Sequence, residues 1–315
     1  MLSFERGKPI AIFTEGKMKG KELKLYGEHE FGMLPKPDII VDKKDYPDLL
    51  DKTFYKDNNI TPAKKRYFND VLSGKTQIEK ENMSAELEEQ LENAETYIEN
   101  KLRTQISFDG PSTKLFPLPQ KFSERIYVPA PSGSGKSTFI GEYLKYLKEM
   151  KNGKKRKIYI FSRVEEDEPL DKYKPIRIPL EEDYFKNNPL QIEDFKNSIL
   201  IFDDIDTIMN KSVVKYVRNF RDDVLETGRH YDITILSTSH IIANFLATRT
   251  LINESNAIVL FPRGSSFAAV ANFLERYLGF TKNQIRYVEN LPTRWIWFWK
   301  EYPKYAVHER GAFIY

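Results

Sequence analysis

The chain has 315 residues, of which 30% are charged, and its formal net charge is only +3. A balance this close does not by itself indicate a nucleic-acid partner. The absence of cysteine excludes disulfides, iron–sulfur clusters and thiolate zinc sites, and the four scattered histidines argue against a structural metal site. No apolar run approaches the roughly 20 residues that span a bilayer, and the first residues lack the apolar stretch of a signal peptide. We therefore expect a soluble intracellular protein without a membrane partner.

Residues 1–120 are expected to form an α+β extension, whose role the sequence does not indicate. The segments 9–14 and 22–26 predict a β-hairpin with its turn at 17–20. A short strand is expected at 38–41.

Two helices are expected in the rest of this extension. Thr61-Pro62 is typical of an N-cap followed by proline at the first helical position, which predicts a helix over 62–72. Apolar residues at helical spacing predict a second helix over 77–103, opened by a capping box at 76–79. The other face of this second helix is dense in glutamate, which is typical of a solvated surface.

Residues 107–120 are rich in Pro, Ser and Lys and predict a linker into residues 121–315. There, short apolar strands alternate with helices, which predicts an α/β domain with a mostly parallel central sheet flanked by helices. Strands are expected at 125–128, 157–161, 198–202, 233–237 and 257–261, helices at 136–150, 212–227, 266–278 and 281–289, and a closing pair of strands at 294–300 and 305–315.

The segment Ala130-Pro-Ser-Gly-Ser-Gly-Lys-Ser137 matches the Walker A pattern, with alanine in place of its first glycine. Gly133 and Gly135 let the backbone aim N–H groups at phosphate oxygens, and the helix that follows turns its positive end toward them. Lys136 would reach the β- and γ-phosphates, and the hydroxyl of Ser137 would ligate Mg²⁺. ATP and Mg²⁺ are therefore the expected cofactors, held by Ser132, Gly133, Ser134, Gly135, Lys136, Ser137 and Thr138.

An acidic pair, Asp203 and Asp204, follows the continuous apolar run 199–202. Such a run is typical of a buried parallel strand, and ligands of open α/β sheets bind where these strands end. We expect Asp203 to hold Mg²⁺, directly or through water. Asp204 would orient the attacking water and act as general base.

The strand at 233–237 runs into small polar residues and His240. Polar groups beside a γ-phosphate can sense it and position water, so His240 is expected as a sensor, with Ser239 as the second choice. The alternative is a loop histidine with a purely local role.

These residues together resemble the genome-packaging ATPases of large DNA viruses and virophages, the poxvirus-type branch of the FtsK–HerA superfamily of P-loop NTPases. The resemblance covers residues 121–315. It depends on the phosphate loop, on 201–204, 226–233 and 237–240, and on the tail from Arg294-Trp295 through Tyr302-Pro303. The Gly-Arg-His stretch at 228–230 is its most discriminating part.

The resemblance implies a RecA/FtsK-like sheet with the sensor strand between the phosphate-loop strand and the aspartate strand. It also implies an ATP-hydrolysing motor that translocates double-stranded viral DNA into a capsid, with capsid proteins as partners. Such motors form homo-oligomeric rings, hexamers or pentamers, with a site completed by an arginine of the neighbouring subunit. Arg229 is the first candidate for that arginine and Arg263 the second. The expected location is the host cytoplasm, a viral factory or the virion.

Other functions fit the same residues. A helicase or another DNA pump would use the same site, and a nucleotide-switched scaffold protein would hydrolyse little ATP. A small-molecule kinase is disfavoured because no arginine-rich lid follows the aspartate strand.

Two further patterns leave alternatives open. The basic run 151–157 fits a solvated turn, with contact to DNA phosphates as the alternative. Trp295, Trp297 and Trp299 alternate on one strand face, which fits a core strand, with base stacking as the alternative.

Overall fold

A ten-stranded sheet forms the centre of the computed structural model, which describes residues 1–27, 41–79, 81, 83–108, 113–243 and 248–315. The strand order is β4-β14-β13-β12-β11-β6-β10-β9-β7-β8. The strands from β11 to β8 pair in parallel, and β12, β13, β14 and β4 continue the sheet in antiparallel pairs. Their bounds are β4 Gln105–Ser107, β6 Arg125–Pro129, β7 Ile158–Phe161, β8 Ile176–Arg177, β9 Ile199–Phe202, β10 Thr234–Ser239, β11 Ala257–Leu260, β12 Ile296–Trp299, β13 Tyr305–His308 and β14 Gly311–Ile314. The predicted α/β fold with a mostly parallel central sheet is confirmed.

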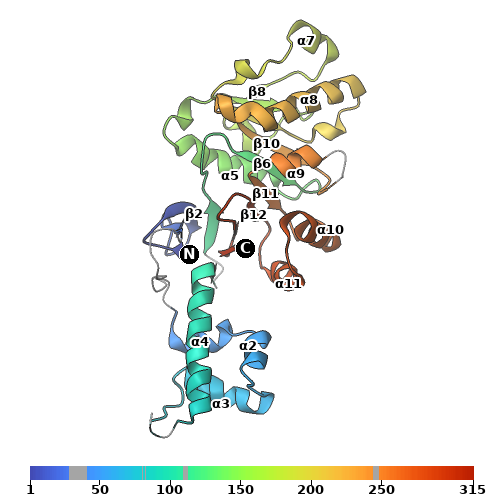
Figure 1. The fold of residues 1–315 in the computed structure, drawn as a ribbon. Coiled ribbons are helices and arrows are strands. Elements are labelled where there is room, and N and C mark those ends of the chain that lie inside the picture. Colours follow the sequence, from blue (N-terminus) through green and yellow to red (C-terminus); the bar gives the residue numbers. More distant parts are fainter. Residues whose placement is uncertain (28–40, 80, 82, 109–112, 244–247) are drawn as a thin grey trace.

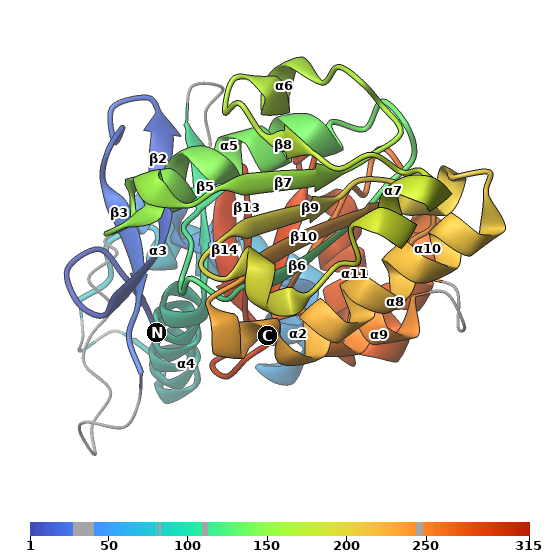
Figure 2. The ribbon, with the colours of Figure 1, turned by 90° about the horizontal axis from the view of Figure 1, so that it is seen from above.

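Helices cover both faces of this sheet (Figures 1 and 2). Helix α5 packs on one face, and α8, α9, α10 and α11 pack on the other. The bounds are α5 Lys136–Glu149, α8 Lys211–Thr227, α9 Arg249–Glu254, α10 Phe267–Phe273 and α11 Lys282–Asn290, with α6 Glu168–Asp171 and α7 Glu182–Asn187 in the connections on either side of β8. Among the helices of the described residues, none is both long and apolar enough to cross a bilayer.

Strand β9, which directly precedes the two aspartates, is buried between the two helical layers. All four of its residues are fully buried. Ile199 and Ile201 pack toward α5, while Leu200 and Phe202 pack toward α8. A strand between two helical layers must be apolar at every position, because successive side chains point to opposite faces.

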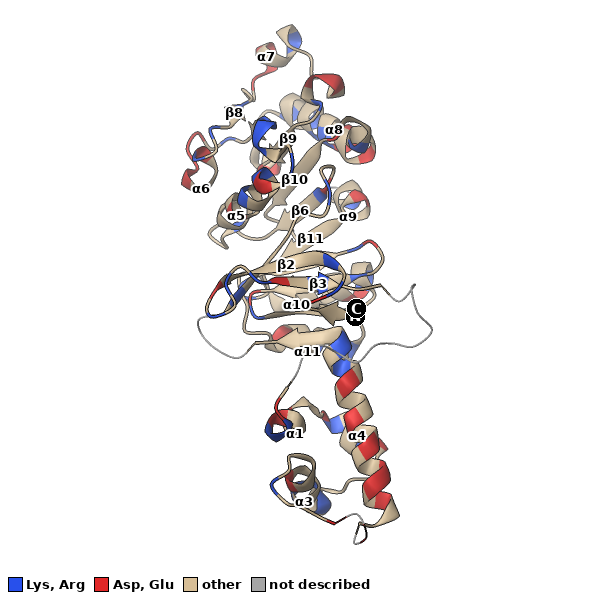
Figure 3. Cartoon of the chain, turned by 90° about the vertical axis from the view of Figure 1, so that its left-hand side faces the viewer, with Lys and Arg blue, Asp and Glu red and all other residues tan. Residues whose placement is uncertain are grey.

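The N-terminal part adds a small antiparallel sheet of order β1-β3-β2-β5 and a group of helices that projects away from the main sheet (Figures 1 and 3). The predicted hairpin is present as β2 and β3, and the helix predicted over 62–72 is α3. The bounds are β1 Leu2–Ser3, β2 Lys8–Glu15, β3 Glu22–Leu25, β5 Lys114–Pro117, α1 Tyr46–Leu49, α2 Lys52–Asp57, α3 Pro62–Leu72 and α4 Ala85–Thr104. The strand predicted at 38–41 lies, except for Val41, outside the described residues, and Val41 is not in a strand.

Two predictions for this part are wrong. The capping box at 76–79 does not open a helix: α4 begins at Ala85, and Ser84 caps it by accepting a hydrogen bond from Leu87 N at 3.3 Å. The segment predicted as a linker contains paired strand: Ser107 ends β4, which pairs with β14, and Lys114–Pro117 form β5, which pairs with β2. Composition rich in Pro and Ser did not reveal these partners, which lie far away in the sequence.

Of the two patterns with open alternatives, the tryptophans are structural, whereas the basic run keeps both alternatives because Lys151, Lys154, Lys155 and Lys157 are exposed. Trp295, Trp297 and Trp299 lie in the core that includes α5, so base stacking by these rings is excluded. In the basic run, Arg156 is buried: it donates to Thr234 Oγ1 at 2.8 Å and to Phe122 O at 3.0 Å. The predicted closing pair of strands is a set of three, β12 to β14.

Glu124 is a fully buried carboxyl group just before β6. It accepts hydrogen bonds from the N–H groups of Gln120 and Lys121 and from the hydroxyl of Tyr143 on α5. Burial raises the pKa of Glu124 from 4.5 to about 8, although the two N–H donors oppose this shift. The folded protein therefore keeps a proton that the unfolded chain releases above pH 4.5.

This linkage predicts that stability decreases as pH rises toward 8. The contribution of Glu124 to the free energy of unfolding should fall by about 1 kcal/mol per pH unit between pH 6 and 8. Urea unfolding at several pH values should show a smaller decrease for Glu124→Gln, whose amide is neutral at every pH. All other groups are shared, so parallel profiles for the two proteins would contradict the prediction.

Candidate active site

The phosphate loop connects the carboxyl end of β6 to the first turn of α5. Gly133 and Gly135 have φ values of +75° and +95°, a region that favours glycine. Helix α5 starts at Lys136, so its first N–H groups, which have no partner within the helix, face the loop. Among the other predicted nucleotide-binding residues, Ser132 and Thr138 are exposed, and Ser134 and Ser137 are half-buried.

Strand β10 lies between β6 and β9 and is parallel to both. This is the inserted sensor strand that the family resemblance implied. Since the carboxyl ends of these strands meet at one edge, the residues that follow them come together.

Asp204 is at the centre of this group. Its Oδ2 atom lies 3.1 Å from Lys136 Nζ and 3.2 Å from His240 Nε2. Asp204 has φ +44°, which an aspartate tolerates better than most residues and which turns the chain sharply after β9. Lys136 Nζ also donates to Ala130 O at 2.8 Å. The ammonium group of Lys136 is thus held at the phosphate loop, where a phosphate oxygen could replace Ala130 O as its partner.

Asp203 is the deeper of the two acids and is 9% exposed. Ser162 Oγ donates to its Oδ2 at 2.9 Å, and Thr238 Oγ1 lies 2.9 Å from Oδ1 of both Asp203 and Asp204. Burial, and secondly the charge of Asp204, raise the pKa of Asp203. Within the part of the chain that the structure describes, no lysine or arginine forms an ion pair with Asp203.

A buried carboxylate with hydroxyl neighbours and no cationic partner fits a site for Mg²⁺, which prefers oxygen ligands and keeps most of its water. The described residues contain no group of three or more His, Cys, Asp or Glu that could hold a metal. A Mg²⁺ ion here would therefore need oxygens of the nucleotide and water beside Asp203 and Ser137.

Sequence reasoning missed Thr238 and Ser162. Thr238 joins the two acids and also accepts a hydrogen bond from Asp204 N at 2.8 Å. Ser239, which was the second choice as sensor, instead donates to Asp206 Oδ2 at 3.4 Å. The position of Ser162 directly after β7, a neighbour of β9, was a usable signal.

The two candidate arginine fingers lie at opposite ends of the parallel strands, Arg263 at the carboxyl end and Arg229 at the amino end. Arg263 follows β11, and a Cβ atom on the adjacent Gly264 would lie only 2.8 Å from Ser134 Oγ, so this loop contacts its own phosphate loop. Arg229 precedes β10, whereas His240 follows it. With about 3.3 Å per residue, six residues of β10 separate them by roughly 20 Å. Arg229 therefore cannot reach the phosphate loop of its own chain.

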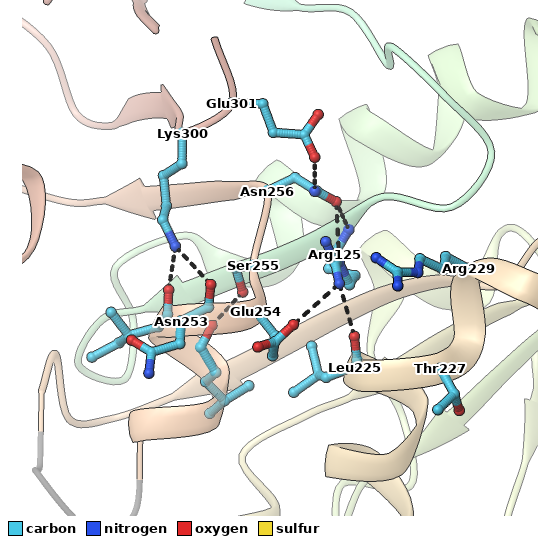
Figure 4. Close-up of polar contacts among 12 residues, drawn as sticks. Arg125, Leu225, Thr227, Arg229, Asn253, Glu254, Ser255, Asn256, Lys300 and Glu301 are labelled. Atoms are coloured by element: carbon cyan, nitrogen blue, oxygen red, sulfur yellow. Dashed lines mark hydrogen bonds and ion pairs between the residues drawn. The ribbon is translucent and has the colours of Figure 1, made fainter.

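Arg229 is exposed and lies beside Arg125 at the amino end of β6 (Figure 4). Arg125 is anchored: it donates to Leu225 O at 3.0 Å and to Glu254 Oε2 at 3.3 Å. Burial lowers the pKa of Arg125; the charges of Glu254 and Glu301 oppose this shift, and the charge of Arg229 adds to it. Arg229 itself makes only a long contact, 3.5 Å, from Nε to His230 Nε2 among the contacts found in the described residues.

Comparison with known proteins identifies one relative. No family model matches the chain. The chain is 37% identical over 205 residues to "Uncharacterized protein V3" of Sputnik virophage, and the match covers 64% of this chain and 82% of that protein. The chain belongs to the V3 protein family. The phosphate loop, the acidic pair and the mostly parallel sheet give this V3 family member the fold of a P-loop NTPase.

Solved structures with a similar arrangement are more distant from this V3 family member, each at 13% identity. One is the genome packaging NTPase B204 of Sulfolobus turreted icosahedral virus 2 in complex with AMPPCP (TM-score 0.41, 57% of this chain and 94% of that chain). Another is the pCW3 conjugation coupling protein TcpA with ATPγS (0.40, 66% and 65%). A third is the cytoplasmic domain of the Thermomonospora curvata type VII secretion ATPase EccC (0.41, 67% and 29%).

Proposed function

We propose that this protein is an ATPase that couples ATP hydrolysis to translocation of double-stranded DNA and packages a viral genome into a capsid. The observation that supports the ATPase part best is the contact of Asp204 with both Lys136 and His240 beside the phosphate loop. A lysine, a general base and a sensor within one contact network are the parts that phosphoryl transfer to water needs.

In this proposal the nucleotide triphosphate lies on the loop from Ser132 to Thr138. Lys136 exchanges its contact with Ala130 O for a phosphate oxygen. Asp203 and Ser137 would hold Mg²⁺, which would neutralise charge on the β- and γ-phosphates. Asp204 accepts the proton of the attacking water, while Thr238 fixes both carboxylates and His240 reports on the γ-phosphate.

The exposed Arg229 supports an oligomer with the site between subunits. Arg229 lies at the amino end of the strands, whereas its own phosphate loop lies at their carboxyl end. Arg229 can therefore complete only the site of a neighbouring subunit. We propose a homo-oligomeric ring, a hexamer or a pentamer, that acts with capsid proteins in the host cytoplasm, a viral factory or the virion. In the same proposal residues 1–120 are an N-terminal extension and residues 121–315 are the ATPase domain.

Steady-state ATP hydrolysis with and without duplex DNA tests the proposal, and Lys136→Ala shows whether the activity belongs to this site. We expect turnover that rises with duplex DNA in the parent protein and is lost in Lys136→Ala. Turnover that is absent, or that ignores DNA in the assembled protein, would overturn the motor proposal and favour the nucleotide-switched scaffold.

A further inference from the structure

A surface cavity of about 530 Å³ lies beside the loop that follows Asp204. Its lining includes Asp206 and Met209 from that loop and Lys211, Lys215 and Arg218 from α8. Met209 is 85% exposed. Figure 3 shows basic positions on α8 at the end of the molecule opposite the acidic helix α4. The cavity therefore opens to solvent next to the proposed hydrolytic residues.

The charges of this cavity are unbalanced. Arg218 donates to Asp206 Oδ1 from Nε at 3.0 Å and from Nη2 at 2.7 Å, and Arg221 is paired with Asp222 at 2.8 Å. Both acids are thus neutralised by arginine. Lys211 and Lys215 are exposed and form no ion pair with any residue in the described ranges, so the cavity carries an excess of two positive charges.

The spacing of these lysines suits a nucleic-acid backbone. Lys211 and Lys215 are four residues apart on α8, which places their Cβ atoms about 6 Å apart on one face of the helix. Each strand of duplex DNA carries one phosphate per roughly 3.4 Å of axis, so the two ammonium groups can face phosphates of the same strand.

Asp206 connects this cavity to the site. One carboxylate oxygen, Oδ1, binds Arg218, and the other, Oδ2, accepts a hydrogen bond from Ser239 at 3.4 Å. Ser239 lies between Thr238 and His240, which both contact Asp204. A DNA phosphate that draws Arg218 away from Asp206 would free Asp206 to move and would thereby change its hydrogen bond with Ser239. Ser239 is the chain neighbour of both Thr238 and His240, so the change would reach the residues that contact Asp204.

We infer that the cavity on α8 is a binding site for the backbone of duplex DNA, and that the Arg218–Asp206 pair links its occupation to the hydrolytic site. The inference rests on the proposed function, for which it names the DNA contact. The lysines of the cavity would contact only the phosphates of the backbone, so binding is independent of base sequence.

The binding part is tested by fluorescence anisotropy with a labelled duplex DNA and the full chain over a range of salt concentrations. For Lys211→Ala/Lys215→Ala, the slope of log K against log salt should become shallower by about 2, because two phosphate contacts are lost. The matched control is Lys282→Ala/Arg286→Ala, two exposed basic residues with the same spacing on α11, which should keep the parent slope. Equal slopes in all three proteins, or equal loss in both variants, would overturn the inference.

The coupling part is tested with Asp206→Asn, which weakens the hold on Arg218. The variant should still bind duplex DNA, but the ratio of turnover with DNA to turnover without DNA should fall to about 1. A ratio equal to that of the parent protein would refute the link. Turnover without DNA in the parent protein tests the ATPase itself, so failure of the proposed function is distinguishable from failure of the cavity as a DNA site.

Discussion

Replacing Asp204 by asparagine is expected to lower the rate of ATP hydrolysis by about 10²–10⁴-fold while ATP still binds. An amide has nearly the shape of the carboxylate, but it cannot accept the proton of the attacking water. Lys136 and the glycines of the phosphate loop are unchanged, so the affinity for nucleotide should not fall. The rate follows from a phosphate-release assay, and the affinity from titration with a fluorescent ATP analogue.

The matched control for this change is Asp183→Asn, an exposed carboxylate on α7 that pairs only with Lys186 at 3.2 Å among its ion pairs in the described residues. It should hydrolyse ATP like the parent protein. If Asp204→Asn retained turnover within about tenfold of the parent, the general base would have to be a different residue.

The second large effect is expected for Arg229→Ala, which should lower turnover by about 10³-fold or more. An arginine finger neutralises charge that develops on the transferred phosphoryl group. In the proposed ring Arg229 completes the site of the neighbouring subunit, so mixing Arg229→Ala with Asp204→Asn subunits should restore activity. In a randomly mixed ring, about a quarter of the head-to-tail interfaces combine an intact Asp204 with an intact Arg229.

Arg263→Ala is the control that separates the two candidates. The loop of Arg263 lies against the phosphate loop of its own chain, so Arg263 would act on the site of its own subunit. In a mixture of Arg263→Ala and Asp204→Asn subunits, no subunit carries both Arg263 and Asp204 intact. Any loss it causes should therefore persist in the mixture. Restoration by Arg263→Ala in place of Arg229→Ala would assign the finger to Arg263.

The parts of the site that the sequence predicts well are those encoded by neighbouring residues. The Walker A segment and the acidic pair each lie within one strand and its following turn, so local chemistry is enough to place them. Thr238 and Ser162 act across strands, and their roles depend on the lateral order β7-β9-β10, which the sequence did not specify at the level of single contacts.

The errors in the N-terminal part have a similar cause. The capping box at 76–79 satisfies a local pattern, but Ser84 caps the actual helix. Strands β4 and β5 are three and four residues long, and each is stabilised by a partner about 100 residues or more away. The division of the chain at residue 120 stays a prediction.

Helix α4 passes directly into β4, since Thr104 ends the helix and Gln105 begins the strand. No turn lies between them, so a tilt of β4 at the edge of the main sheet would tilt α4 with it. Twenty helical residues extend about 30 Å, and a tilt of about 10° at the sheet edge would displace the far end of α4 by about 5 Å. A small rearrangement of the sheet edge would thereby become a larger displacement at the tip of the N-terminal helices.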